Sequence, residues 1–394
     1  MSLLPLTELQ AEIQATARSF AEREIAPLAG ERDRESRFDR SMVQQFADLG
    51  FLGMMLPEEY DGLGLDANTY LLALEEIAVA DASAAVLMSV HNSLPTQMLL
   101  NYGSAEQKEK FLKPMARGEW LGAFALSEPE AGSDAAALSC QAVRDGNDWL
   151  LTGTKAWVSH GSFADVILCM ARTDSSDNRL GAKGISAFIL TPDLPGFAVG
   201  KKEAKMGLCS SPTVSLLLDN CRVPANRLLG DVGSGFIYAL ASLDHGRLGI
   251  AAQAIGIGRA ALEAAARYAL DRRQFNKAIA EFQAIQFKLA DMATQLTAAR
   301  TLLHAAAAAK TRGERVTRFS SMAKLFATET AMKVTTEAIQ IFGGYGYVTD
   351  YPVERFFRDA KVTEIYEGTS EVQRIVIARD VLAAAAATDG SLTN

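Results

Sequence analysis

Cysteine and histidine are scarce in this chain, which holds four of each among 394 residues. The cysteines form no CxxC pair and lie mostly in apolar, strand-like runs, so we expect reduced core residues of an intracellular protein. They are Cys140, Cys169, Cys209 and Cys221. The histidines have no metal-ligand spacing such as HExxH, and the sequence therefore predicts no metal site.

Long hydrophobic runs, an N-terminal leader and an excess of positive charge are also lacking. No apolar run approaches the roughly 20 residues that span a bilayer, so no membrane insertion is expected. Residues 1–6 contain no basic residue, which favours a cytoplasmic bacterial protein. A mitochondrial matrix protein whose leader has been removed fits less simply. The formal net charge of −8 disfavours a nucleic-acid partner, although a few local arginines suffice for an anionic ligand.

The composition and the apolar periodicity of the sequence change twice along the chain, so we predict an α+β protein with three domains. Residues 1–120 show helical apolar periodicity, starting at a capping-box pattern of Thr7 and Gln10. Residues 121–235 read as a small β domain, and residues 236–394 as an Ala-rich helical bundle.

Individual elements follow from the same patterns. In the first domain we expect helices near residues 40–49, 67–79 and 105–115. In the second we expect strands near 149–152, 164–170, 185–190 and 213–218, bounded by turns at 145–148, 174–177 and 195–196. In the third we expect long helices near 237–272, 281–311, 318–342 and 370–386.

Two glycine-rich segments resemble nucleotide-binding motifs but lack their context. Residues 256–261 fit G-x-G-x-x-A, yet no strand precedes them. We therefore expect close helix packing there rather than a dinucleotide site. Residues 343–347 lack the Lys-Ser/Thr pair of a phosphate-binding loop.

The most informative segment is residues 366–371, which reads Tyr-Glu-Gly-Thr-Ser-Glu. Gly368 allows unusual backbone angles, and the hydroxyls of Thr369 and Ser370 can cap a helix that starts there. On such a turn Glu367 could enter a pocket as a general base, with N–H groups facing an anion or a carbonyl. Taken alone, a solvated glutamate before a helix is the simpler interpretation.

Six ordered segments remove that ambiguity, because together they resemble the acyl-CoA dehydrogenases, flavoenzymes that desaturate acyl-CoA thioesters. These segments are residues 124–134, 157–159, 244–247, 272–275, 340–344 and 366–371. The resemblance extends from about residue 6 to about residue 382. It implies an acyl-CoA dehydrogenase-like fold, in which a middle β-barrel-like domain and a C-terminal four-helix bundle enclose the flavin.

Desaturation of a thioester requires a base for the Cα–H, donors for negative charge on the carbonyl oxygen, and an acceptor for hydride. No ordinary side chain accepts hydride, so FAD is implied. The resemblance places the base on Glu367, whose backbone N–H, with a flavin ribityl hydroxyl, would bind the thioester oxygen. Some branches of the family carry the base at the position of Gly246, and glycine there strengthens the assignment to Glu367.

The resemblance also implies flavin contacts from the middle domain. Trp157 considered alone is better explained as a core aromatic residue, and its place in the motif reverses that preference. Glu130 replaces a residue that is commonly small in the family, without removing a flavin contact. The implied contacts are Phe124, Leu126, Ser127, Gly132, Ser133, Trp157 and Ser159.

A second set of implied contacts holds the diphosphate and adenine of FAD. In the family several of these come from a neighbouring subunit, so a homo-oligomer is implied, usually a tetramer. Arg272 alone could equally form a charge pair at a helix end, and Asn276 stands where glycine is usual. The set is Arg272, Phe275, Gln283, Gln340, Gly343, Gly344, Thr369 and Glu371.

The implied acyl-CoA contacts are Ser133, Asp244, Arg247 and Gly368. Arg247 offers charge and fork geometry, although an isolated arginine is more often a salt-bridge partner. Residues 87–95 are expected to line the acyl pocket. Their Met and Leu side chains would restrict it to short chains, and Pro95 would kink the helix.

We therefore expect an FAD-dependent acyl-CoA dehydrogenase of the short-chain type, which forms trans-2-enoyl-CoA and passes electrons to an electron-transfer flavoprotein. Residues 88–94, 243–252 and 341–347 carry the likeness to that branch. An acyl-CoA oxidase is an alternative, but such chains usually carry a further C-terminal domain. A non-catalytic flavin- or acyl-CoA-binding scaffold is another, and Glu367 argues against it.

Overall fold

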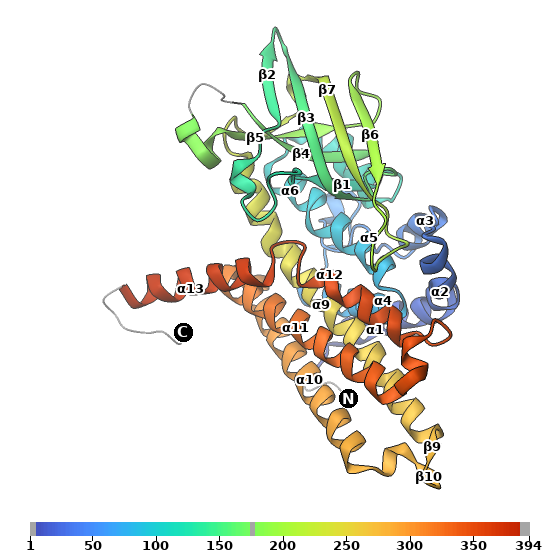
Figure 1. Cartoon of the computed structure of the whole chain (residues 1–394). Coiled ribbons are helices and arrows are strands. Elements are labelled where there is room, and N and C mark those ends of the chain that lie inside the picture. Colours follow the sequence, from blue (N-terminus) through green and yellow to red (C-terminus); the bar gives the residue numbers. More distant parts are fainter. Residues whose placement is uncertain (1–4, 174–177, 387–394) are drawn as a thin grey trace.

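Helices come first, strands follow, and long helices finish the chain, in the order that the sequence predicts (Figure 1). The computed structural model describes residues 5–173 and 178–386, so the turn predicted at 174–177 lies outside it. Strand β1 begins at Gly122 and helix α9 at Gly235. The domain limits at residues 120 and 235 stay predictions.

Side-chain caps begin several N-terminal helices. The predicted capping box is present at α1, where Thr7 Oγ1 accepts from Gln10 N and Gln10 Oε1 accepts from Thr7 N. The break at Pro95 is complete: it starts a new helix instead of kinking one, which suits a residue without an N–H donor. The helices are α1 (Glu8–Phe20), α2 (Ala26–Glu35), α3 (Ser41–Asp48), α4 (Ala67–Ala80), α5 (Ala82–Ser93), α6 (Pro95–Tyr102), α7 (Ala105–Gln107) and α8 (Lys113–Ala116).

The middle region forms one mixed sheet with the order β6-β7-β3-β2-β4-β5-β8, and β1 pairs with β4. Side chains from β1, β3, β4, β5 and β7 share a single core, which is the barrel-like arrangement expected. Three of the four cysteines are buried in it, whereas Cys209 is only partly buried, outside the strands. The strands are β1 (Gly122–Ala125), β2 (Gln141–Asp145), β3 (Asp148–Ser159), β4 (Val166–Arg172), β5 (Ile185–Leu190), β6 (Phe197–Lys202), β7 (Thr213–Pro224) and β8 (Leu228–Leu229).

The C-terminal helices pack side by side around α9 (Gly235–Asp271) and α11 (Thr317–Phe342). Glycines allow the closest approaches: a Cβ at Gly256 would lie 2.6 Å from Ala78 Cβ, and one at Gly258 would lie 2.6 Å from Leu296 Cδ2. Helix packing therefore explains the G-x-G-x-x-A pattern. The remaining elements are β9 (Arg273–Gln274), β10 (Lys277–Ala278), α10 (Gln283–Thr311), α12 (Val353–Thr363) and α13 (Ser370–Ala386).

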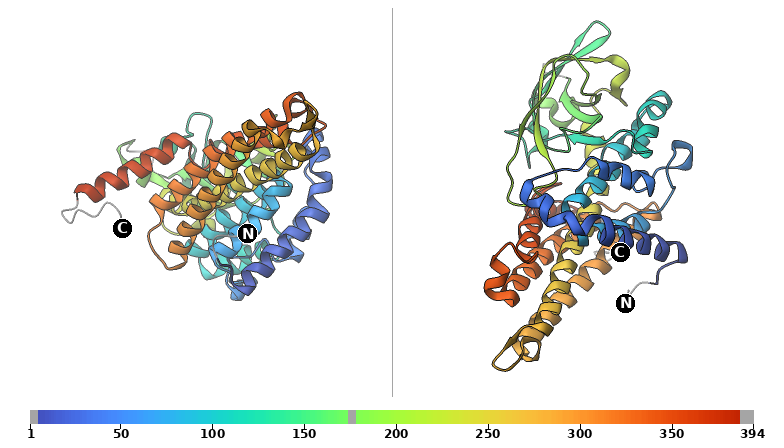
Figure 2. Two further views of the ribbon diagram at one scale, coloured as in Figure 1. Left: turned by 90° about the horizontal axis from the view of Figure 1, so that it is seen from below. Right: turned by 90° about the vertical axis from the view of Figure 1, so that its right-hand side faces the viewer.

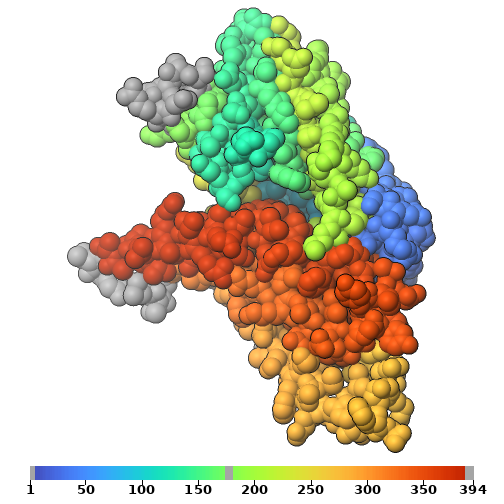
Figure 3. Space-filling view, viewed as in Figure 1, coloured from blue at the N-terminus to red at the C-terminus, as the bar shows by residue number. Residues whose placement is uncertain are grey.

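The N-terminal helices α4 and α5 pack on α9, and the sheet stands at one end of this helical layer (Figures 1 and 2). The opposite end of the layer carries the β9–β10 hairpin. Helices α12 and α13 lie at the surface between the strands and the C-terminal helices (Figure 3). In the described part of the chain, no helix combines the length and apolar character needed to cross a membrane.

Candidate active site

The turn between α12 and α13 carries Glu367 in a conformation that non-glycine residues rarely adopt. Its φ is +52°, and that of Gly368 is +95°; such a residue costs about 1–3 kcal/mol unless its surroundings enforce the conformation. The ends of the turn are tied, since Ser370 N donates to Glu364 O at 2.9 Å. Thr369 Oγ1 accepts from Val372 N at 3.3 Å, which confirms the predicted hydroxyl cap for Thr369. The hydroxyl of Ser370 is buried without a hydrogen-bond partner among the described residues, so it provides no cap.

Two buried side chains donate hydrogen bonds to the backbone carbonyl of Gly368, the residue that follows Glu367. Lys324 Nζ on α11 donates to Gly368 O at 2.6 Å, and Gln373 Nε2 on α13 donates to the same oxygen at 2.9 Å. Gln373 Nε2 also lies 3.3 Å from Glu367 O. The unusual backbone of the turn is therefore fixed by side chains from two helices.

The carboxyl group of Glu367 is not a solvated surface charge. Its Oε2 atom is buried and has no hydrogen-bond partner among the described residues. Burial raises the pKa of Glu367 to about 7, while the positive charges of Lys324 and Arg247 oppose that rise. A carboxyl group with this pKa can accept a proton at neutral pH, as a general base requires.

Helix α9 supplies the opposite wall of the site. Gly246 faces the Glu367 carboxylate so closely that a Cβ there would lie 1.9 Å from Oε2. The next residue, Arg247, is buried; its Nη1 lies 2.6 Å from Asp244 Oδ1 and 3.4 Å from Ser321 Oγ. Arg247 is thus a salt-bridge partner in this structure. Its contact with acyl-CoA, like those of Ser133, Asp244 and Gly368, stays a prediction.

The predicted flavin residues of the middle domain gather at the end of β1 and along β3. Ser127 O accepts from Ala156 N at 2.9 Å, which joins the segment after Phe124 and Leu126 to β3. An irregularity in the β3–β7 register places Trp157 at φ +60° and leaves it 63% exposed. The bulge turns the indole outward, so Trp157 is not a core residue. Ser159 ends the same strand.

A buried ion pair supports that segment. Lys155 Nζ lies 2.7 Å from Glu128 Oε1 and 3.2 Å from Leu126 O. Glu128 also accepts from the backbone N–H groups of Ser139 and Cys140. Burial favours the neutral acid, but Lys155 and these N–H groups outweigh it and hold the pKa of Glu128 below its usual value. The adjacent Gly132 and Ser133 remain exposed.

The predicted diphosphate and adenine residues lie elsewhere, mostly near the β9–β10 hairpin. Arg272, Gly343 and Gly344 line one pocket, where the Arg272 guanidinium sits 5.3 Å from the centre of the Tyr345 ring. Gln283 and Gln340 are exposed at the facing ends of α10 and α11. Thr369 and Glu371 do not join this group, because they belong to the Glu367 turn and the first turn of α13.

The hairpin tip is formed by Phe275 and Asn276, whose φ angles are +48° and +65°. Two left-handed residues are typical of a tight two-residue hairpin loop, and Asn tolerates this conformation well. Asn276 therefore replaces the usual glycine without loss of the turn. Phe275 is 89% exposed, although the Phe282 ring lies edge-on to it with the ring centres 6.1 Å apart.

The sequence does not point to the side chains that support the Glu367 turn and the segment after β1. These supporting side chains are Lys324, Gln373 and the Glu128–Lys155 pair. A Lys within an Ala-rich helix gives no local signal of burial, because only the packing of α11 against the turn reveals it. An inward-facing position in the helical period is the one indication that the sequence offers.

Comparison with known proteins agrees with this geometry. The N-terminal, middle and C-terminal domain models of acyl-CoA dehydrogenase match residues 7–119, 123–221 and 233–382. The mouse mitochondrial short-chain specific acyl-CoA dehydrogenase is 48% identical over 377 residues, covering 96% of this chain and 91% of its own length.

Two solved structures extend the comparison. The butyryl-CoA dehydrogenase of Megasphaera elsdenii has a TM-score of 0.94 and 44% identity, covering 96% of this chain and 99% of that one. A chain from a structural study of the electron transferring flavoprotein of Acidaminococcus fermentans has a TM-score of 0.94 and 46% identity, covering 97% and 100%. The resemblance seen in the sequence is confirmed: the chain belongs to the acyl-CoA dehydrogenase family, a family of FAD-dependent oxidoreductases.

Proposed function

We propose that this enzyme converts short-chain acyl-CoA to trans-2-enoyl-CoA, with Glu367 as the base that takes the α-proton. The observation that carries the proposal is the Glu367 carboxyl group, whose Oε2 atom is buried and free of hydrogen bonds among the described residues, and whose pKa is raised to about 7. Loss of the α-proton to Glu367 and of the β-hydrogen as hydride leaves the electron pair of the new C=C bond. Bound FAD supplies the hydride acceptor.

The predicted cofactor residues fit FAD in their exposure and chemistry. Trp157 presents an outward-facing ring, and Leu126, Ser127 and Ser159 lie near it along the chain or across the β1–β3 connection. Cβ atoms added at Gly132, Gly343 and Gly344 would meet nothing within 4 Å. Gly343 adopts φ +61°, a backbone conformation that itself favours glycine. Neither internal packing nor a positive φ requires glycine at Gly132 and Gly344, whereas close approach of a ligand to the backbone would.

One chain does not bring both sets of FAD residues to one flavin. Gly246 and Arg272 are 26 residues apart (272 − 246) along α9 and its C-cap, which corresponds to about 39 Å at 1.5 Å per residue. We infer that the β9–β10 hairpin of a second copy completes each FAD site. Exposed, strained Phe275 at the hairpin tip is placed to make such a contact.

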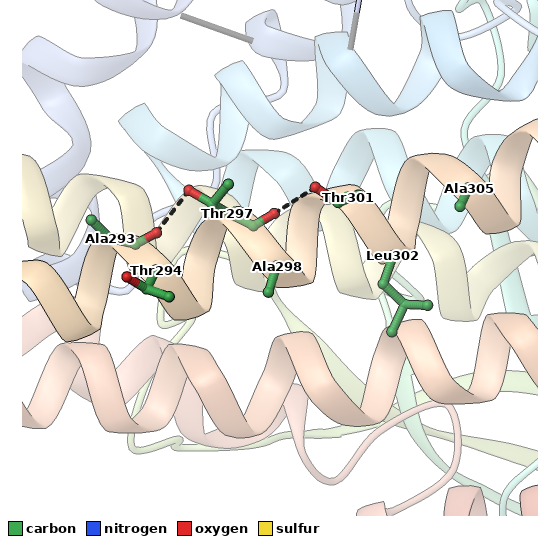
Figure 4. A pocket seen from close by; sticks show the side chains of 7 residues that line it. All are labelled: Ala293, Thr294, Thr297, Ala298, Thr301, Leu302 and Ala305. Carbon is green, nitrogen blue, oxygen red and sulfur yellow. Dashed lines mark hydrogen bonds between the residues drawn. The ribbon is translucent and has the colours of Figure 1, made fainter. Parts of the chain in front are cut away.

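Helix α10 offers a surface for this association (Figure 4). Its groove is lined by small side chains, and the hydroxyls of Thr297 and Thr301 bond to carbonyls of their own helix at 2.8 and 2.9 Å. The methyl groups of these two threonines then remain to contact a second copy of the chain. A homotetramer is proposed from these features and from the family. The lining residues are Ala293, Thr294, Thr297, Ala298, Thr301, Leu302 and Ala305.

A preference for short acyl chains is supported by the relatives and by the packing of α5 on α9. A Cβ at Gly249 would lie 2.6 Å from Ser89 Oγ and 3.6 Å from Leu74 Cδ2. Gly246, which faces Glu367, is one helical turn away, so little space remains beyond the base. The proposed pocket is therefore shallow, with residues 87–95 at its far end.

The proposed electron acceptor is an electron-transfer flavoprotein. The cellular location stays a prediction.

The proposed function is tested by anaerobic mixing of the yellow holoenzyme with butyryl-CoA. We expect bleaching of the flavin, formation of crotonyl-CoA and reoxidation by an electron-transfer flavoprotein. Faster reoxidation by oxygen would indicate an oxidase, and no bleaching with any acyl-CoA would indicate a binding scaffold.

A further inference from the structure

Lys324 is a buried cation that the proposed chemistry has not used so far. It lies on the inner face of α11 and has no exposed surface. Burying an ammonium group is costly unless other groups compensate it. Its one hydrogen bond among the described residues goes to Gly368 O, at 2.6 Å.

That carbonyl belongs to the turn that positions the base. It already accepts from Gln373 Nε2, so a neutral donor is present and the carbonyl would not be left unsatisfied without Lys324. The hydrogen bond to Gly368 O alone therefore does not explain why the second donor carries a charge. The charged groups around Lys324 supply a reason.

Several charged groups face Lys324 and Glu367. Glu367 has the strongest attraction for the ammonium; Glu364 and Glu371 attract it more weakly, and Arg247 opposes it. Glu364 is already paired with Lys361 at 2.6 Å, and Glu371 is exposed. On the other side, the phenols of Tyr70 and Tyr366 face Glu367 and carry no charge at neutral pH. The ammonium of Lys324 and the carboxyl group of Glu367 are therefore each other's principal counter-charge.

We propose that Lys324 is a positioning residue for Glu367, which fixes the turn through Gly368 O and places a buried positive charge that keeps the base ionised. The proposal rests on the function proposed above. Burial lowers the pKa of Lys324 to about 8, so the ammonium is charged where Glu367 titrates, near pH 7. Replacing it by a neutral group should raise the pH at which Glu367 becomes a base.

The test compares Lys324→Met and Lys324→Gln with the wild-type holoenzyme. The measurement is the pH dependence of kcat/KM for butyryl-CoA, which reports groups of the free enzyme. Loss of an opposite charge near a carboxylate should move the midpoint upward by about one to three pH units. Below that midpoint, activity should fall about tenfold for each unit of this displacement.

Three control variants separate the effect of charge from that of geometry. Gln373→Leu removes the neutral donor from the same carbonyl, so it should lower the rate at every pH without moving the midpoint. Lys333→Met removes an exposed charge from the same helix and should change neither the rate nor the midpoint. Lys324→Arg keeps the charge and should retain the wild-type midpoint.

A second readout does not depend on turnover. Infrared difference titration of the enzyme without acyl-CoA, with Glu367→Gln to assign the band, should show protonated Glu367 persisting to higher pH in Lys324→Met and Lys324→Gln. An unchanged midpoint in whichever of these variants folds and retains FAD would overturn the proposal. Absence of flavin reduction in the wild type would instead overturn the proposed function, while the infrared titration would still decide the role of Lys324.

Discussion

Gly246 on α9 lies directly against the carboxylate of Glu367: a methyl group at residue 246 would come within 1.9 Å of Glu367 Oε2. Gly246 lies on α9 and Glu367 on the turn between α12 and α13, about 120 positions further along the chain. Each residue limits which side chain can stand at the other position. A side chain at 246 would occupy the space of the Glu367 carboxylate. The alternative base position that the family resemblance implies and the base proposed here, Glu367, therefore reach the same point in space from opposite walls.

Gly246→Ala should displace the Glu367 carboxylate, and displacement of a reacting group by about 1 Å can cost roughly 10²-fold in rate. We expect a loss of kcat/KM of that order while FAD stays bound. Glu367→Asp withdraws the carboxylate by one methylene. In the double variant the methyl group therefore has room, and its added cost should be much smaller than in the wild type. Losses that simply multiply would show that the contact does not position the base.

Glu367→Gln should abolish flavin reduction without releasing FAD, because loss of a positioned general base costs about 10²–10⁴ in rate. Since burial raises the pKa of Glu367 to about 7, the group is protonated below pH 7 and ionised above it. In the wild type, kcat/KM should therefore rise with pH through about 7. Stopped-flow reduction by butyryl-CoA between pH 5.5 and 9 checks both points (the range spans this pKa by about two units). Near-normal reduction by the variant would remove Glu367 from the base role.

Much of this architecture can be predicted from local sequence patterns. Helices α10 and α11 were predicted to within two residues at each end, because their apolar period is long and uninterrupted. The Glu367 turn was predicted because Gly368 and Thr369 encode it locally. By contrast, α12 was not predicted, and the outward orientation of Trp157 depends on a bulge between β3 and β7 that a single strand's sequence does not specify.

Arg272→Ala should weaken FAD binding and make the remaining affinity depend on protein concentration, because a site completed by a second copy obeys mass action. Its neighbour Arg273 is exposed on the same hairpin but does not line the Arg272 pocket. Arg273→Ala is therefore the matched control and should retain FAD. The measurement is FAD content after gel filtration at several protein concentrations. A wild-type monomer that holds FAD tightly at high dilution would contradict the two-copy site.

The last prediction concerns acyl chain length. If α5 closes the pocket one helical turn beyond the base, each methylene that does not fit should cost about 1–3 kcal/mol. We therefore expect kcat/KM for butyryl- or hexanoyl-CoA to exceed that for dodecanoyl-CoA by several orders of magnitude. Gly249→Ala places a methyl group toward Ser89 Oγ, so it should reduce turnover of hexanoyl-CoA more than that of butyryl-CoA. The ratio of the two substrates is its own control, since damage to the base would lower both equally. Equal or better use of dodecanoyl-CoA would show that the chain leaves the site by another route, while the role of Glu367 would stand.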